Sequence, residues 1–114
     1  MDEQRFVIEQ EHRYSRHDLI PWWVQQKIAV SKIFVAGVGA IGNEVLKNLA
    51  LMGFGHLTIV DFDEVSLSNL TRSVLFREED QGQSKVEAAK RRLLELNPDL
   101  QITRSRGIYN LMWV

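Results

Sequence analysis

The chain has 114 residues, which is enough for one domain with a single hydrophobic core. Hydrophobic residues make up 45% of it, charged residues make up 25%, and the formal net charge is -1. This composition is typical of soluble globular proteins and argues against binding to nucleic acids or anionic membranes through bulk positive charge. The sequence contains no cysteine, which excludes a thiol nucleophile, a disulfide bond and a cysteine-bound zinc ion within these residues.

Residues 1–31 are expected to form a helical arm before the main fold. Residues 1–18 are polar and acidic, without the apolar stretch of a signal peptide, and no run in the chain approaches the roughly 20 apolar residues that span a bilayer. We therefore expect a cytoplasmic protein. Pro21 interrupts the arm, so any helix restarts there. We interpret Trp22 and Trp23 as packing residues or anchors of a dimer interface rather than as side chains that stack on a ligand.

An apolar, β-branched run, Lys32–Val38, leads into a glycine-rich turn and predicts a buried parallel strand. The glycines Gly37, Gly39 and Gly42 have the spacing G-x-G-x-x-G. The next segment, Ala40–Gly53, repeats apolar residues at intervals of four and three, which predicts an amphipathic helix closed by its last glycine. The predicted apolar face of this helix consists of Ile41, Val45, Leu49 and Met52.

A second strand, His56–Asp63, carries two aspartates near its carboxyl end. A connection of twenty residues, 64–83, follows without clear periodicity, and connections of this length are often functional. Ser84 and Glu87 then form a capping-box pattern at the start of a helix that an Asn-Pro pair ends. The expected apolar stripe of this helix is Val86, Ala89, Leu93 and Leu96, and its "KRR" run, residues 90–92, is interpreted as a solvated face.

Residues 100–104 read as a third strand, so the order is strand, helix, strand, long loop, helix, strand. Crossover connections of this kind build parallel sheets. The predicted fold class is therefore α/β, the N-terminal half of a Rossmann-like doubly wound parallel sheet over residues 32–114, preceded by the helical arm.

The glycine loop lies where a strand feeds the first turn of a helix, a place where free backbone N–H groups and the helix dipole attract phosphate. Gly37 and Gly39 allow a tight turn and a close ligand, and Gly42 lets the helix pack closely. Asp61 follows 19 residues after Gly42, where a carboxylate can bind ribose hydroxyls. Glycines that serve packing alone are the structural alternative. The loop by itself does not separate NAD from ATP.

Four quoted segments occur in order: "RYSRH" (13–17), "GVGAIG" (37–42), "VDFDEVSLSNLTRSVLF" (60–76) and "DQGQSKVEAAKRRLLELNP" (80–98). They resemble R-Y-x-R-Q, G-x-G-[GA]-[LI]-G, D-x-D-x-V-x-x-S-N-L-x-R-Q and D-x-G-x-x-K-[AV]-x-x-A…N-P of the MoeB/ThiF/HesA family, the bacterial relatives of ubiquitin-activating enzymes. This resemblance implies an enzyme that binds ATP and Mg²⁺ and adenylates the C-terminal glycine of a ubiquitin-like or sulfur-carrier protein, or of a peptide, with release of pyrophosphate.

The resemblance also implies roles for individual residues. Asp61 would hold the ribose, and Asp63 would stand near the phosphates and the metal. Asn69 and Arg72 would contact the nucleotide, with Arg72 facing the phosphates. The remaining implied contacts are the backbone of Gly37, Gly39, Ala40 and Gly42, the phosphate-binding Lys85, and Arg16, which would reach the phosphates of the other subunit of a homodimer as an arginine finger.

The chemistry of the residues agrees with this set. Attack of a carboxylate on the α-phosphate brings two anions together, so catalysis needs cations and a helix N-terminus more than a nucleophilic side chain. Arg16, Arg72 and Lys85 supply three cations from separate segments.

Each candidate side chain also has a structural interpretation. Arg16 and Arg72 would then be surface arginines, Asn69 a cap or turn residue, and Asp63 a stabiliser of the long loop. Lys85 opposes the helix dipole in a first turn, which disfavours a purely structural role. His12, His17 and His56 show no metal-ligand spacing, so no protein metal site is predicted from them.

The pattern departs from the family at His17 and Ser73, where the family has glutamines near the nucleotide. The family's metal-associated aspartate follows the third strand in a D-x-x-D-N-type segment that does not occur before Val114, so we expect a fragment or a chain completed by a partner. Two alternative functions remain open. One is a catalytically inactive interaction module of the same family, and the other is an NAD-binding oxidoreductase half-domain.

Overall fold

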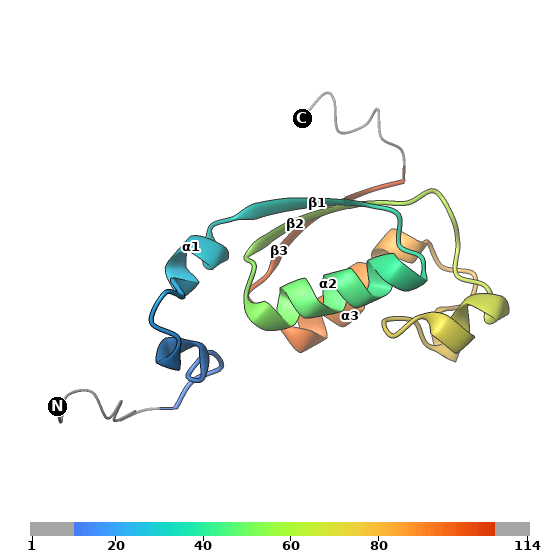
Figure 1. Ribbon diagram of the computed structural model, residues 1–114. Helices are drawn as coiled ribbons and strands as arrows, with labels where there is room; N and C mark the ends of the chain where they lie inside the picture. The colour runs from blue at the N-terminus through green and yellow to red at the C-terminus, as the bar shows by residue number, and fades with distance from the viewer. Residues whose placement is uncertain (1–10, 107–114) are drawn as a thin grey trace, which may run out of the picture.

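The computed structural model describes residues 11–106, which contain a three-stranded parallel sheet (Figure 1). The strands are β1 (Lys32–Ala36), β2 (His56–Val60) and β3 (Gln101–Ser105), and they lie in the order β1-β2-β3. Their registers match end to end, because the first residues of all three strands pair with one another, as do the last. All three carboxyl ends therefore lie at one edge, the edge at which open α/β sheets bind ligands. Residues 1–10 of the expected arm and 107–114 of the expected main domain lie outside the described residues.

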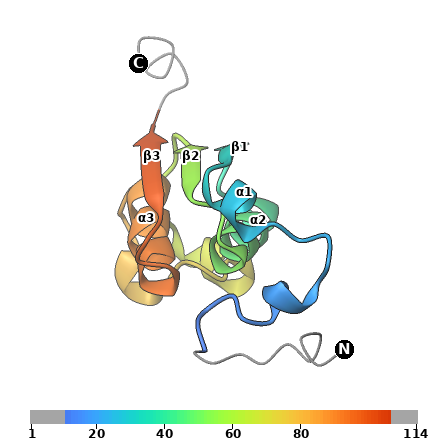
Figure 2. The same ribbon diagram turned by 90° about the vertical axis from the view of Figure 1, so that its left-hand side faces the viewer.

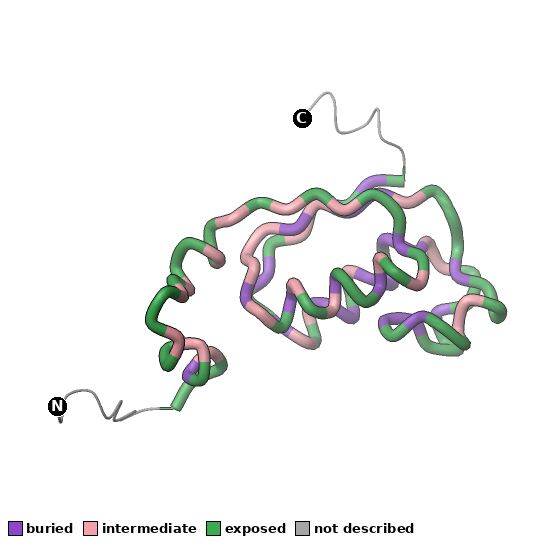
Figure 3. The backbone as a smooth tube through the Cα atoms, in the orientation of Figure 1, coloured by how far each residue is buried: buried purple, intermediate pink, exposed green. Residues whose placement is uncertain are grey.

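Two helices cover one face of this sheet, α2 (Ala40–Met52) and α3 (Lys85–Leu96) (Figures 1 and 2). The alternation of β2 places Leu57 and Ile59 in the buried layer, where they are 1% and 0% exposed. Figure 3 shows buried positions in β2 and in both helices. The Rossmann-like α/β fold expected from the sequence is confirmed. Within residues 11–106 no helix is long and apolar enough to cross a membrane.

Strand β1 is less buried than its sequence predicts. None of its five residues is fully buried, and Phe34 is 52% exposed. The physical reason is its position at an edge of the described sheet, with helices against one face only. The apolar run therefore predicted the strand correctly but overestimated how far its side chains are buried.

The predicted apolar face of α2 is correct at Leu49, which packs against the core, and wrong at Ile41 and Val45. Ile41 is 80% and Val45 40% exposed, whereas the fully buried residues are Asn43, Leu46 and Ala50. The helix is rotated so that a polar residue enters the core, where its amide has partners, while Ile41 and Val45 line an open hollow beside β1. The helix ends as predicted, at Gly53 in a left-handed conformation with φ +94°.

Helix α3 begins at Lys85 after the predicted N-cap, Ser84, whose hydroxyl accepts a hydrogen bond from the Glu87 amide at 3.3 Å. Only this half of the expected capping box forms. The Glu87 carboxylate, which would make the other half, accepts instead from Arg104 Nε on β3 at 2.6 Å. The long connection is not featureless. It contains two 3₁₀ helices, η3 (Leu67–Arg72) and η4 (Glu78–Asp80).

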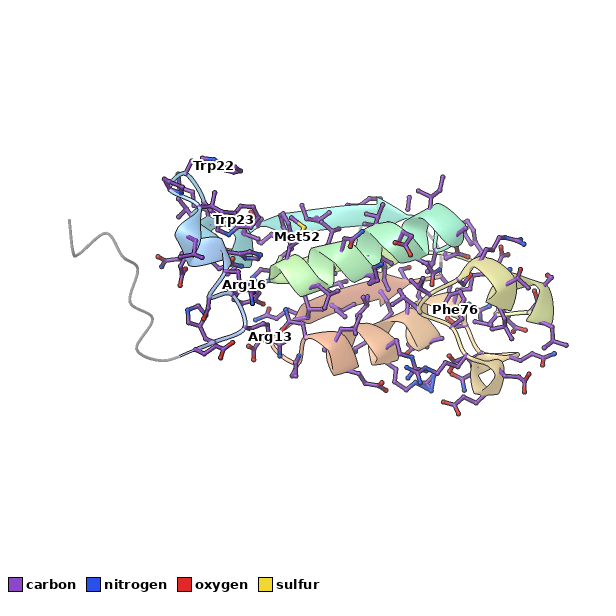
Figure 4. The ribbon with its side chains drawn as sticks, turned by 60° about the horizontal axis from the view of Figure 1, so that its bottom comes forward. Arg13, Arg16, Trp22, Trp23, Met52 and Phe76 are labelled. Carbon is purple, nitrogen blue, oxygen red and sulfur yellow. The ribbon has the colours of Figure 1, made fainter. Side chains whose placement is uncertain are left out.

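The described part of the arm contains a 3₁₀ turn, η2 (His17–Leu19), and a short helix, α1 (Gln25–Ala29), on either side of Pro21. It docks on the carboxyl ends of both long helices. Gln25 Nε2 donates to the Met52 carbonyl at 2.8 Å, and Arg13 Nη1 donates to the Leu96 carbonyl at 2.8 Å. The arm thus satisfies terminal carbonyls that a helix leaves without partners. Figure 4 shows Arg13 and Arg16 at this end, far from Phe76 at the other.

Candidate nucleotide site at the glycine loop

The glycine loop follows β1 and turns directly into α2. Gly37 has φ +98°, a left-handed conformation that strongly favours glycine. A Cβ on Gly42 would lie 2.2 Å from the Gly37 carbonyl oxygen, so only glycine lets the first turn of α2 pack against the loop. A Cβ on Gly37 or Gly39 would meet no atom within 4 Å. One glycine therefore serves close packing, and the other two face open space.

Backbone N–H groups are available where α2 begins. The Gly37 amide bonds to the Val60 carbonyl at 2.8 Å, and the Asn43 amide to the Gly39 carbonyl at 2.8 Å. Between them, the amides of Gly39, Ala40 and Ile41 bond to no acceptor in residues 11–106. These groups lie at the positive end of the helix dipole, and an open hollow of about 500 Å³ adjoins them. The arrangement can hold an anion such as phosphate. The predicted residues that line the hollow are Gly37, Gly39, Ala40 and Gly42.

Asp61, just beyond β2, is bonded to the glycine loop. Its Oδ2 accepts from the Val38 amide at 2.7 Å, and its Oδ1 accepts from the Asp63 amide at 2.8 Å. Each carboxylate oxygen keeps a second lone pair for a ligand hydroxyl. The structure therefore brings Asp61 and the glycine loop together, as their spacing predicts.

Lys85 and Asp63 form a second group. Lys85 Nζ lies 3.9 Å from Asp63 Oδ2, and the Lys85 amide donates to the Asp63 carbonyl at 2.9 Å. The lysine side chain is only 10% exposed, whereas the aspartate is 73% exposed. Because the Asp63 amide also binds Asp61, the three residues are linked to the loop by consecutive hydrogen bonds.

Asn69 and Arg72 lie in η3, which Figure 1 places at the same end of the molecule as the start of α2. The Asn69 side chain accepts from the Ser66 amide at 2.9 Å and caps η3, which is the structural role left open for it. The Arg72 guanidinium is exposed and donates to the Ser68 carbonyl at 3.2 Å.

Arg16 does not join these residues. It is exposed, lies in the arm and, with Glu11, Ser15 and Leu19, lines a separate hollow of about 290 Å³. Figure 4 places it near Met52, at the carboxyl end of α2, whereas the glycine loop is at the amino end. Within one chain, Arg16 and the glycine loop are therefore at opposite ends.

Sequence reasoning missed a buried polar network behind the site. Arg92, predicted on a solvated face, is buried and donates to Asp80 at 3.2 Å and to Glu95 at 2.9 Å. Burial alone would lower the pKa of Arg92, but hydrogen bonds to Glu95 and Asp80 outweigh it and raise that pKa above its ordinary value. The pattern E-E-D followed twelve residues later by arginine was the available signal, but a single sequence does not show that such charges meet across a loop.

Metal ligation by the protein alone is limited at this site. Residues 11–106 contain no group of three or more histidine, aspartate or glutamate side chains that could hold a metal ion. Mg²⁺ at nucleotide sites, however, is held largely by substrate phosphates and water with one or two carboxylates. The exposed Asp63 is a carboxylate of this kind.

The ThiF family profile matches residues 12–107. The chain is 42% identical over 94 residues to the sulfur carrier protein ThiS adenylyltransferase of Escherichia coli K12, covering 80% of this chain and 38% of that protein. It is 44% identical over 81 residues to SUMO-activating enzyme subunit 2 of Dictyostelium discoideum, covering 71% of this chain and 12% of that protein.

Comparison with solved structures also finds relatives of this fold, here two structures of MccB. E. coli MccB with AMPCPP and MccA has a TM-score of 0.82 at 34% identity, covering 95% of this chain and 35% of that one. MccB with ATP has a TM-score of 0.78 at 35% identity, covering 92% of this chain and 34% of that one. The chain thus spans about a third of MccB and less than two-fifths of either curated relative. Since the family profile covers most of the sequence, the chain belongs to the ThiF family.

Proposed function

We propose that this chain is the ATP-binding part of an adenylyltransferase. The observation that carries the proposal is the pairing of Asp61 with the glycine loop next to the free amides of Gly39, Ala40 and Ile41. The phosphates would lie against these amides and the ribose against Asp61. The similarity to MccB, which has been solved with ATP, supports ATP as the nucleotide.

The reaction proposed is activation of a carboxylate. A carboxylate oxygen of the acceptor forms a bond to the α-phosphorus, the bond from that phosphorus to the bridging oxygen breaks, and pyrophosphate leaves. The main barrier is the approach of two anions, so positive groups around the phosphates stabilise the transition state. Lys85, held beside Asp63, and Arg72, on η3, are the cations proposed for this role.

Mg²⁺, when bound, would neutralise phosphate charge, with Asp63 as its proposed protein ligand and Asn69 as a neighbouring nucleotide contact. We further propose a homodimer in which Arg16 of each chain serves the site of the other, because the two lie at opposite ends of one chain. The acceptor is proposed to be the C-terminal glycine of a ubiquitin-like or sulfur-carrier protein, or a peptide, since relatives include a ThiS adenylyltransferase and MccB with MccA.

The first test is nucleotide protection in thermal unfolding, with ATP and NAD⁺ compared at equal concentrations. At a hundred times its Kd, ATP would stabilise the chain by about 2.7 kcal/mol, or roughly 10 °C in Tm for a domain of this size. Lys85→Gln is expected to abolish most of this shift. Lys47→Gln is the matched control, because Lys47 pairs with Glu44 on the outer surface of α2. Stronger protection by NAD⁺ than by ATP would refute the assignment.

The second test is exchange of labelled pyrophosphate into ATP by the intact natural protein with a carrier that ends in Gly-Gly. Exchange that depends on the carrier is expected. ATP protection without any exchange would favour the inactive interaction module instead.

A further inference from the structure

The segment that follows Arg72 is anchored at Leu75, whose two backbone groups both bind buried side chains. The Leu75 amide donates to Asn43 Oδ1 at 2.9 Å, and the Leu75 carbonyl accepts from Arg92 Nε at 3.2 Å. Asn43 is fully buried on α2, and Arg92 is 6% exposed on α3. Leu75 is thereby fixed to both helices at once.

Asn43 also holds the glycine loop. Its Nδ2 donates to the Gly39 carbonyl at 2.8 Å and to the Val38 carbonyl at 3.2 Å. Both amide hydrogens and the amide oxygen are therefore used, on two segments that are more than thirty residues apart in the chain. No hydrophobic side chain could replace these bonds, and an unpaired amide at Leu75 would be costly because Leu75 is only 1% exposed.

Arg72 lies three residues before this anchor. Three residues of extended chain span at most about 11 Å, so the anchor restricts where the Arg72 backbone can lie. Among residues 11–106 the guanidinium bonds only to the Ser68 carbonyl, within its own 3₁₀ helix. Arg72 is therefore connected to the glycine loop through Leu75, three residues later in the chain, whose amide binds Asn43.

We propose that Asn43 is a positioning residue. It holds the segment from Arg72 to Leu75 at a fixed position relative to the glycine loop and thereby sets the affinity for phosphate. The first part of this inference, the mechanical link from Asn43 to Leu75, does not depend on the proposed function. The second part, the effect on ATP affinity, rests on it. The chain offers a matched control in Asn97. This residue is also buried, and its Nδ2 donates to the Ala50 carbonyl at 3.0 Å, but at the arm end of the same helix pair.

The mechanical link is tested by amide hydrogen exchange in the 114-residue chain without nucleotide. Asn43→Ala is expected to accelerate exchange of the Leu75 amide by at least about tenfold beyond any global change. Asn97→Ala, which removes a bond of the same type, is expected to leave Leu75 within about twofold of the wild type. Equal exchange at Leu75 in the two variants would overturn the link.

The effect on phosphate is tested by a double-mutant cycle on ATP affinity, measured by calorimetry at a temperature where every variant is folded. Asn43→Ala is expected to weaken ATP binding about tenfold in the wild-type background but no more than about threefold when Arg72 is already alanine. A loss by the same factor in both backgrounds would overturn the positioning role, because it would show that Asn43 acts without Arg72. Asn97→Ala should leave ATP affinity unchanged.

The two readouts separate failure of this inference from failure of the proposed function. Accelerated exchange at Leu75 with no ATP binding by the wild type would refute the proposed function and, with it, the role in phosphate affinity, while the mechanical link stands. ATP binding by the wild type with unchanged exchange at Leu75 would refute the link and leave the proposed function intact.

Discussion

Replacement of Gly42 by alanine tests whether close packing shapes the glycine loop. The new Cβ would lie 2.2 Å from the Gly37 carbonyl oxygen and 3.1 Å from its carbon, both backbone atoms that have no side-chain freedom to move away. Overpacking of this kind costs about 3 kcal/mol at the upper end of its usual range. Alanine regains up to about 1 kcal/mol of helix propensity. The free energy of unfolding should therefore fall by about 2 kcal/mol.

The assay is urea or thermal unfolding followed by circular dichroism, with an expected drop in Tm of about 7 °C. Gly39→Ala is the control, because a Cβ there meets nothing within 4 Å and its φ is −87°. We expect Gly39→Ala to cost only about 0.5–1 kcal/mol, because alanine is a poorer N-cap than glycine, and to weaken ATP binding, since its methyl group occupies ligand space. Wild-type stability of Gly42→Ala would show that the loop does not approach the helix as described.

Three further substitutions probe the contacts around the site. Asp61→Asn places an amide NH₂ against a backbone N–H, so stability should fall by about 1–2 kcal/mol and ATP affinity at least about tenfold, measured by denaturation and calorimetry. Arg92→Leu removes the buried arginine partner of Asp80 and leaves the half-exposed Arg91 as its only pairing cation among the described residues, so it should cost about 3 kcal/mol in denaturation. Gln25→Ala removes the cap on Met52 and should cost about 1 kcal/mol, with faster amide exchange where the arm meets α2.

Matched controls accompany these substitutions. Arg91→Leu changes the neighbouring arginine, which also reaches Asp80, at 3.4 Å, but is 45% exposed, and it should therefore cost less than about 1 kcal/mol. Gln26→Ala changes an exposed glutamine beside Gln25 and should have no measurable effect on exchange in α2. Equal losses for Arg91→Leu and Arg92→Leu would contradict the burial difference, and unchanged exchange in Gln25→Ala would contradict the capping role of the arm.

The order of strands and helices could be read from the sequence because local signals set it. A β-branched run before glycine, a serine N-cap and an Asn-Pro stop act within a few residues, and the structure confirms the strand and both ends of the helix that they predict. The pairing of Asp61 with the glycine loop was likewise predictable, since parallel strands bring their carboxyl ends to one edge.

The rotation of α2 was not predictable from its own periodicity. Ile41 and Val45 suggested one buried face, but the core takes up Asn43, because the long loop and the glycine loop both supply partners for its amide. The burial of Arg92 was not predictable for the same reason. Its burial depends on Asp80 and Glu95, and contacts between segments that are distant in the chain leave no periodic trace in one sequence.

The separation of Arg16 from the glycine loop has a consequence for measurement. If the arginine of one molecule completes the site of another, nucleotide binding and self-association obey the same mass action. Apparent affinity for ATP should then rise as the protein is concentrated, and dilution should weaken it with no change in fold. An Arg16→Ala protein should give titration curves that superimpose at every protein concentration.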